Sequence, residues 1–147
     1  MRTRLAVVAA ALAAAAVLTG CSGSNDTAGS SAPAAGSDDR SAAAAAALEE
    51  SVRTYTKALF GNDATTAYKL VSTRCKKEMT AGDYVTMAET AHHDYGALTI
   101  KNVKVDQIGG DLARVSYGVG VPQFERTAQP WVREGGTWRW DACKSSA

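Results

Sequence analysis

The chain has 147 residues, with 16 basic and 15 acidic side chains, and its formal net charge at pH 7 is +1. A near-neutral chain without a basic stripe argues against a nucleic-acid-binding protein and against electrostatic attachment to a membrane surface. Its length fits one domain of ordinary size together with a segment of different composition.

The first twenty residues have the pattern of a secretory signal. Arg2 and Arg4 supply positive charge, and residues 5–18 form an uncharged run rich in Ala, Val and Leu. A run of this length is shorter than the ~20 residues with which a helix crosses a bilayer. We therefore expect a signal that is removed, and not a membrane-spanning helix. Without Arg2 and Arg4, the chain has 14 basic and 15 acidic side chains, so the absence of a basic surface holds.

The end of this signal, Leu18-Thr19-Gly20-Cys21, resembles the lipobox of bacterial lipoproteins, an apolar-small-small-Cys sequence. The resemblance implies that residues 1–20 are removed, that Cys21 is lipidated, and that the protein is anchored on the extracytoplasmic face of the cell membrane. A lipid group with two acyl chains would hold it stably, whereas one chain binds only marginally. The alternative is an ordinary signal that is cut at an Ala-x-Ala site, with Cys21 incidental.

A tether is predicted over residues 21–40, before a domain over residues 41–147. Residues 22–39 contain Ser, Gly, Ala, Asp and Pro but no large apolar side chain. Such a segment cannot bury a core, so we expect it to be flexible.

Three helices are predicted over residues 41–60, 63–73 and 80–92, because apolar residues recur there at helical spacing. The first is expected to stop at Gly61, and Asp83 completes a capping box at the start of the third. The expected capping residues are Ser41, Asp63 and Thr80. The side chains expected to face the core are Leu48, Val52, Tyr55, Leu59, Ala67, Leu70, Val71, Tyr84, Met87, Ala88 and Ala91.

The pattern then changes to the alternation of β-strands. Leu98 and Ile100 share one parity and residues 103–105 the other, so we expect a β-bulge near Asn102. After a turn at residues 109–111, a second strand is predicted. Its inward residues are Ala113, Val115, Tyr117, Val119 and Val121. Gly118 and Gly120 on its other face indicate strong curvature, and residues 122–129 are predicted to be a loop.

A tight hairpin is predicted around Gly135-Gly136. With these two residues as the turn, Arg133 faces Trp138 and Trp131 faces Trp140, and all four side chains share one face of the sheet. Cross-strand aromatic pairs stabilise a sheet, and Arg133 can add a cation–π contact. This face forms either the floor of the core or the wall of a pocket.

A disulfide between Cys75 and Cys143 is predicted. With Cys21 assigned to the lipid, these are the two cysteines that remain, and an even pair outside the cytoplasm is expected to oxidise. The bond requires the last strand to end by Ala142, since Cys143 would otherwise point away from the helices. The alternative is two buried free thiols.

Several short motifs resemble a known family. They are Gly61-Asn62-Asp63, Arg74-Cys75, Ala113-Arg114-Val115, Trp131-Val132-Arg133, Gly136-Thr137-Trp138-Arg139-Trp140 and Cys143. Over residues 41–144 the chain resembles the NTF2-like (cystatin-like α+β) lipoproteins of high-GC Gram-positive bacteria. The resemblance implies three N-terminal helices packed on a curved antiparallel sheet of about four strands, which wraps into a cone with an open end. Most such lipoproteins have no assigned activity, although the fold also hosts ketosteroid isomerases and SnoaL-like polyketide cyclases.

Few residues indicate catalysis. His92-His93-Asp94 is a titratable cluster, and histidines at the end of a helix interact favourably with its dipole. A metal site would need a third ligand at suitable spacing. The sequence contains no HExxH pattern, Gly-rich phosphate loop or GxSxG elbow. We therefore expect neither a metal nor a cofactor.

The interior is predicted to be apolar and aromatic. We therefore expect a non-catalytic module that binds an apolar small molecule, or an envelope protein, at the open end of the cone. The candidate pocket residues are Tyr55, Tyr117, Trp131, Arg133, Trp138 and Trp140. A competing expectation is that these aromatic side chains fill the cone. The alternative function is an isomerase-like enzyme, for which Asp94 or Asp141 would supply a carboxylate at the rim and a tyrosine the oxyanion donor.

Overall fold

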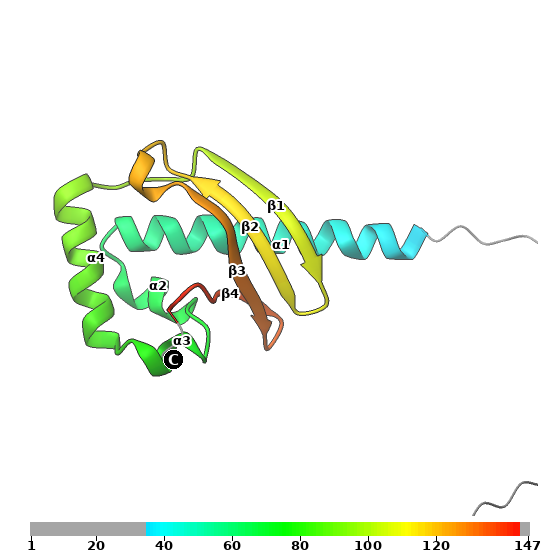
Figure 1. Cartoon of the computed structure of the whole chain (residues 1–147), viewed down its shortest axis with the longest axis horizontal. Helices are drawn as coiled ribbons and strands as arrows, with labels where there is room; N and C mark the ends of the chain where they lie inside the picture. The colour runs from blue at the N-terminus through cyan, green and yellow to red at the C-terminus, as the bar shows by residue number, and fades with distance from the viewer. Residues whose placement is uncertain (1–34, 145–147) are drawn as a thin grey trace, which may run out of the picture. The chain divides into compact units, whose positions relative to one another are not determined.

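The computed structural model describes residues 35–144, which belong to one compact unit spanning residues 33–147. The signal, Cys21 and residues 22–34 of the predicted tether lie outside the described residues. The domain is α+β, with helices followed by a four-stranded antiparallel sheet (Figure 1). Within residues 35–144, no helix has the length and apolar character needed to cross a membrane.

The first helix, α1, covers Ala35–Phe60 and thus begins before Ser41. The predicted N-cap at Ser41 is wrong, and residues 35–40 of the predicted tether are helical. Asp38 in the first turn favours this earlier start, because its carboxylate interacts favourably with the positive end of the helix dipole.

The apolar face of α1 is the predicted one: Leu48, Val52 and Tyr55 are buried and Leu59 is half-buried. The helix stops at Gly61, as predicted. The Gly61 N–H donates to the Lys57 carbonyl at 2.9 Å, and a Cβ at Gly61 would lie 2.6 Å from the same oxygen. Only glycine fits this close approach without a shift of the backbone.

The second helix, α2, covers Ala64–Lys69 and is followed by a short helix, α3, at Cys75–Glu78. Asp63 caps α2 as predicted, since its carboxylate accepts from the Thr66 N–H at 3.0 Å. The predicted end near Thr73 is wrong, because the chain after Leu70 pairs with the last strand instead. The Trp140 N–H donates to the Leu70 carbonyl at 2.7 Å, and the Ser72 N–H donates to the Trp140 carbonyl at 2.9 Å.

The last helix, α4, covers Ala81–Tyr95 and begins with the predicted capping box. The Asp83 N–H donates to the Thr80 hydroxyl at 3.2 Å, and the Thr80 N–H donates to the Asp83 carboxylate at 3.1 Å. The helix continues past His92 and ends where Gly96 takes a φ of 68°. Tyr84 and Ala88 face the core as predicted, whereas Met87 is 38% exposed.

The sheet consists of β1 (Asn102–Gly109), β2 (Leu112–Gly118), β3 (Arg126–Glu134) and β4 (Thr137–Trp140), paired in sequence order. The curved strands cross α1, and α2, α3 and α4 lie toward the C-terminal end of α1 (Figure 1). The part of the predicted loop that follows Glu125 belongs to β3. The remainder contains a 3-10 turn, η1, at Pro122–Phe124.

The β-bulge lies between Val105 and Gln107, and not near Asn102. It changes parity inside β1, so Val103, Val105 and Ile108 all pack against the core. The alternation of Leu98 and Ile100 does not mark a strand. These residues lie in the segment between α4 and β1, where Ile100 still packs against the core.

The hairpin of β3 and β4 has the predicted register, with Trp131 opposite Trp140 and Arg133 opposite Trp138. Gly135 and Gly136 take φ values of 57° and 81°, which suits a two-residue turn in which both central residues need positive φ. Trp131 and Trp138 are each 1% exposed, so they form the floor of the core.

The predicted disulfide joins Cys75 to Cys143, with the two Cα atoms 5.5 Å apart. Since β4 ends at Trp140, Cys143 is free to turn back toward the helices. Next to the disulfide, the Asp141 carboxylate accepts hydrogen bonds from the Ser72 hydroxyl at 2.5 Å and from Arg74 Nε at 3.0 Å. The disulfide thus fastens the end of the sheet to the helical layer.

Candidate functional site

A cavity of about 180 Å³ lies where α1 and α4 meet β2, η1 and the start of β3. We call it the aromatic cavity. It is lined by Tyr55, Thr56, Leu59, Phe60, Met87, Ala91, Tyr117, Val119, Phe124, Arg126 and Trp140. Most of these side chains are apolar or aromatic, which is typical of sites for small molecules.

Tyr55 separates the aromatic cavity from the deeper core. Its ring stacks on Trp140 with centroids 5.9 Å apart and an interplanar angle of 11°. It also meets Trp131 edge to face, at 5.8 Å and 87°. Only 5% of Tyr55 is exposed. Stacked and edge-to-face contacts of this kind are the favoured arrangements of aromatic rings, so they stabilise the position of Tyr55 in this wall.

Phe124 of η1 also lines the cavity. It meets Phe60 at a centroid distance of 4.9 Å and Tyr95 at 4.7 Å, both edge to face. The segment is held by Glu125, whose carboxylate accepts from the Gly120 N–H at 3.2 Å. Gly118 makes room for this contact, because a Cβ there would overlap the Glu125 carboxylate.

The phenols of the cavity stay protonated at neutral pH. Burial raises the pKa of Tyr117 to about 12, although the charge of Arg126 lowers it in part. Burial also raises the pKa of Tyr55 well above its ordinary value, and the neighbouring Tyr84 raises it further. These hydroxyls are therefore hydrogen-bond donors and acceptors, and not nucleophilic phenolates.

Thr56 belongs to the lining, but its hydroxyl oxygen is covered by the protein. The residue is 2% exposed, and its Oγ1 has no hydrogen-bond partner within the part of the chain that the structure describes. A buried hydroxyl without a partner destabilises the fold by ~1–3 kcal/mol. Because a water-sized probe does not reach this oxygen, it is not part of the surface that the cavity offers to a ligand.

Arg126 is the charged residue of the lining. Its Nη1 donates to the carbonyls of Gln123, at 2.8 Å, and Glu125, at 3.3 Å. Its Cζ lies 5.8 Å from the centre of the Phe124 ring. Within residues 35–144, its guanidinium group has no ion pair with a carboxylate.

The structure divides the six predicted pocket residues among three places. Tyr55, Tyr117 and Trp140 line the aromatic cavity. Trp131 and Trp138 lie in the core. Arg133 lies over Trp138, with its Cζ 5.4 Å from the ring centre, and its Nε donates to Asp111 at 2.8 Å.

Sequence reasoning missed Phe60, Phe124 and Arg126. The two last residues fall in the stretch that was predicted to be a loop, and both follow Pro122. A proline favours the first position of a helical turn, so Pro122 was the available signal that a short turn orders this segment.

The titratable cluster singled out in the sequence, His92-His93-Asp94, does not line the aromatic cavity. Nδ1 of His92 donates to the Phe60 carbonyl at 2.6 Å, which ties α4 to the end of α1. His93 and Asp94 pair with each other at 2.8 Å, both exposed. Among the described residues, no group of three His, Cys, Asp or Glu side chains could hold a metal ion.

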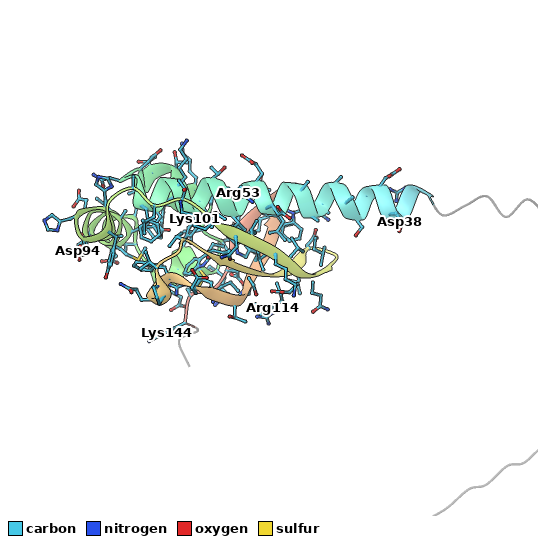
Figure 2. All side chains as sticks on the ribbon, turned by 90° about the horizontal axis from the view of Figure 1, so that it is seen from above. Asp38, Arg53, Asp94, Lys101, Arg114 and Lys144 are labelled. Carbon is cyan, nitrogen blue, oxygen red and sulfur yellow. A yellow bond between two sulfur atoms is a disulfide. The ribbon has the colours of Figure 1, made fainter. Side chains whose placement is uncertain are left out.

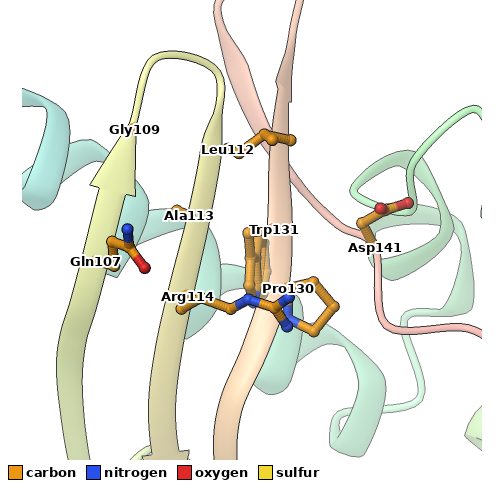
Figure 3. Close-up of a pocket in the computed structure, with 8 residues that line it drawn as sticks. All are labelled: Gln107, Gly109, Leu112, Ala113, Arg114, Pro130, Trp131 and Asp141. Carbon is orange, nitrogen blue, oxygen red and sulfur yellow. The ribbon is translucent and has the colours of Figure 1, made fainter.

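Wider depressions exist on the surface, but their walls are more polar. One of about 380 Å³ lies on the sheet beside the β1–β2 turn, where Leu112 is 65% exposed. Figure 3 shows Arg114 extending across this depression toward Pro130, with Asp141 on the far side.

Another depression, of about 530 Å³, runs along α1 and includes Glu50, Arg53 and Lys57. Figure 2 labels one charged residue from each depression, Arg53 on α1 and Arg114 on the sheet.

Comparisons with protein-family models and with curated proteins find no match to this chain. The fold class therefore rests on the structure, and the site rests on the chemistry of the residues that line it.

Raising the pH above about 10 is expected to lower the free energy of unfolding. An unfolded tyrosine ionises near pH 10, whereas Tyr55 and Tyr117 keep their protons to higher pH in the folded state. The stability that their raised pKa values confer is complete below the unfolded pKa and is lost as the pH rises through the folded values. Denaturant unfolding at a series of alkaline pH values measures the loss.

The double substitution Tyr55→Phe and Tyr117→Phe is the control, and it should weaken this pH dependence. The part that remains comes from Tyr84, whose pKa burial also raises. An unfolding free energy that stays constant in the parent protein from pH 9 to about 12 would contradict the assigned burial of the two phenols.

Proposed function

We propose that the protein is a lipid-anchored, extracytoplasmic binding module of the NTF2-like type, which holds a compact apolar group in the aromatic cavity and releases it unchanged. The order of elements supports the family resemblance, since the helices precede a four-stranded meander that ends in a Trp-rich hairpin. The disulfide Cys75–Cys143 supports a location outside the cytoplasm, because disulfides persist in oxidising compartments.

The observation that carries the proposal is the size and lining of the aromatic cavity. Its volume is about 180 Å³, similar to the ~150 Å³ of an engineered apolar cavity that binds benzene. Pockets for drug-sized ligands measure ~300–1,000 Å³. The proposed occupant is therefore one ring or a short branched chain, and not a molecule as large as a steroid.

Binding without turnover is favoured by the chemistry of the lining. An isomerase-like reaction needs a carboxylate base beside an oxyanion donor. Within the described residues, the lining of the cavity supplies tyrosines but no carboxylate. Asp94 is exposed beside His93, and Asp141 is held by Ser72 and Arg74 near the disulfide.

The occupant can be a free molecule or the side chain of an envelope protein. Both use the same apolar space, and both would be blocked by a side chain that fills it. The free molecule is the form that we propose, because rings from α1, η1 and β4 face the cavity from several sides.

Ala91→Phe should fill the aromatic cavity and weaken the binding of benzyl alcohol, a neutral one-ring probe. Ala91 lies on α4 and lines the cavity. Burial of a group of this size stabilises by ~1.5–3 kcal/mol, so its exclusion should weaken binding by about tenfold or more. Calorimetry or ligand-observed NMR measures the affinity.

The matched control is Ala81→Phe, which adds the same ring at an exposed position at the start of α4. This control should bind benzyl alcohol as the parent does. If a folded Ala91→Phe protein binds the probe as tightly as the parent, or if the parent binds no probe, the proposed function is wrong.

A further inference from the structure

We propose that the natural ligand is a small aromatic carboxylate, with its ring in the aromatic cavity and its carboxylate at Arg126. This inference rests on the proposed function and names the class of molecule that the site would take. It is carried by the position of Arg126 at the wall of an otherwise apolar space.

Arg126 is held in place without being neutralised. Nη1 donates to two backbone carbonyls, and the guanidinium group lies over the Phe124 ring. These contacts fix its plane but supply no negative charge. An arginine side chain has five N–H donors in a fixed fork that matches a carboxylate. The donors on Nε and Nη2 make no hydrogen bond to residues 35–144.

The nearest acidic neighbour in the sequence, Glu125, is engaged elsewhere. Its carboxylate accepts from the Gly120 N–H at 3.2 Å and lies against Gly118. Within the described part of the chain, the lining of the cavity contains no carboxylate. An anion at this position would therefore meet one positive charge and no negative charge from the wall.

The charge of Arg126 acts inside the cavity. It partly offsets the increase that burial causes in the pKa values of Tyr55 and Tyr117. The two phenols remain protonated, so they do not repel an anion. Electrostatic attraction is stronger at such a partly buried site than in water, which favours a charged ligand over a neutral one of the same shape.

The test compares benzoate with benzyl alcohol, two one-ring probes that differ in charge. The purified protein should bind benzoate more tightly than benzyl alcohol. Arg126→Met should weaken the binding of benzoate by about tenfold or more, as expected for the loss of a charge-assisted hydrogen bond. The same substitution should leave the affinity for benzyl alcohol nearly unchanged. Arg126→Lys, which keeps the charge without the fork, should bind benzoate with intermediate affinity.

Arg114→Met is the matched control. Arg114 is an exposed β2 residue whose Nη1 donates to the Ala128 carbonyl, and it does not line the cavity. Arg114→Met should leave the affinities for benzoate and for benzyl alcohol unchanged. Equal affinity of the parent for both probes, or equal weakening of both by Arg126→Met, would overturn the carboxylate assignment while the binding function stands. If neither probe binds the parent, both proposals fail.

Discussion

Replacing Cys75 and Cys143 by alanine together is expected to lower the free energy of unfolding by about 4 kcal/mol. The disulfide closes a loop with a sequence separation of 68 residues, and it limits the freedom of the unfolded chain over that length. Such a loss is a large part of the ~5–15 kcal/mol that stabilises an ordinary domain. Denaturant unfolding of the double variant and of the parent measures the difference.

Two controls separate the cross-link from other effects. A parent protein treated with a reducing agent should lose the same stability as the double variant. Cys21→Ala should lose none, because Cys21 takes no part in the Cys75–Cys143 bond. If both cysteines of the denatured parent react with an alkylating agent before any reduction, the disulfide is absent and the expected loss has no basis.

Replacing Cys21 by serine is expected to move the protein from the membrane fraction to the medium, or to leave it unprocessed. The predicted lipid is attached through the Cys21 thiol, and two acyl chains provide stable attachment. The lipid on Cys21 is the proposed means of attachment. Fractionation of cells followed by mass analysis of the N-terminus measures the change.

Gly20→Ala is the matched control, because it keeps a small residue before the cysteine and should leave processing intact. Cys75→Ala should also remain with the membrane, since it affects folding stability and not the anchor. If Cys21→Ser protein fractionates with the membrane and has the same N-terminal mass as the parent, the lipoprotein assignment is wrong.

The parts of the fold that were predictable depend on local patterns. The alternation around Trp131 and Trp138, together with Gly135-Gly136, determines both the face and the register of the hairpin. The caps at Asp63 and Thr80 are also local, because each side chain bonds a backbone N–H three residues on.

The parts that were not predictable depend on distant residues. α2 ends early because Leu70 and Ser72 bond to Trp140, far along the chain. The parity change before β1 was placed near Asn102, although the bulge lies beyond Val105. Ile100 packs against the core without belonging to a strand. The alternation therefore predicted correctly that Ile100 faces the core, but wrongly that it lies in a β-strand.

The site was partly predictable for the same reason. Alternation shows which face a side chain takes, so Tyr117 and Trp140 were correctly expected on the inner face. It does not show how far along the core each one lies. Trp131 is fully covered, whereas its partner Trp140 reaches the cavity. Arg126 follows an irregular segment whose turn brings it to the cavity wall, and no periodic pattern reports that position.

The most direct test of the binding proposal is an NMR titration of the protein with benzyl alcohol, observed at the methyl groups of its side chains. The methyl resonances of Leu59, Met87, Ala91 and Val119 should shift together and saturate, because all four residues line the aromatic cavity. Leu112, which is exposed on the sheet beside the other depression, should not respond. A saturable response at Leu112 without one at the four cavity residues, or no saturable response at any of them, would contradict the account.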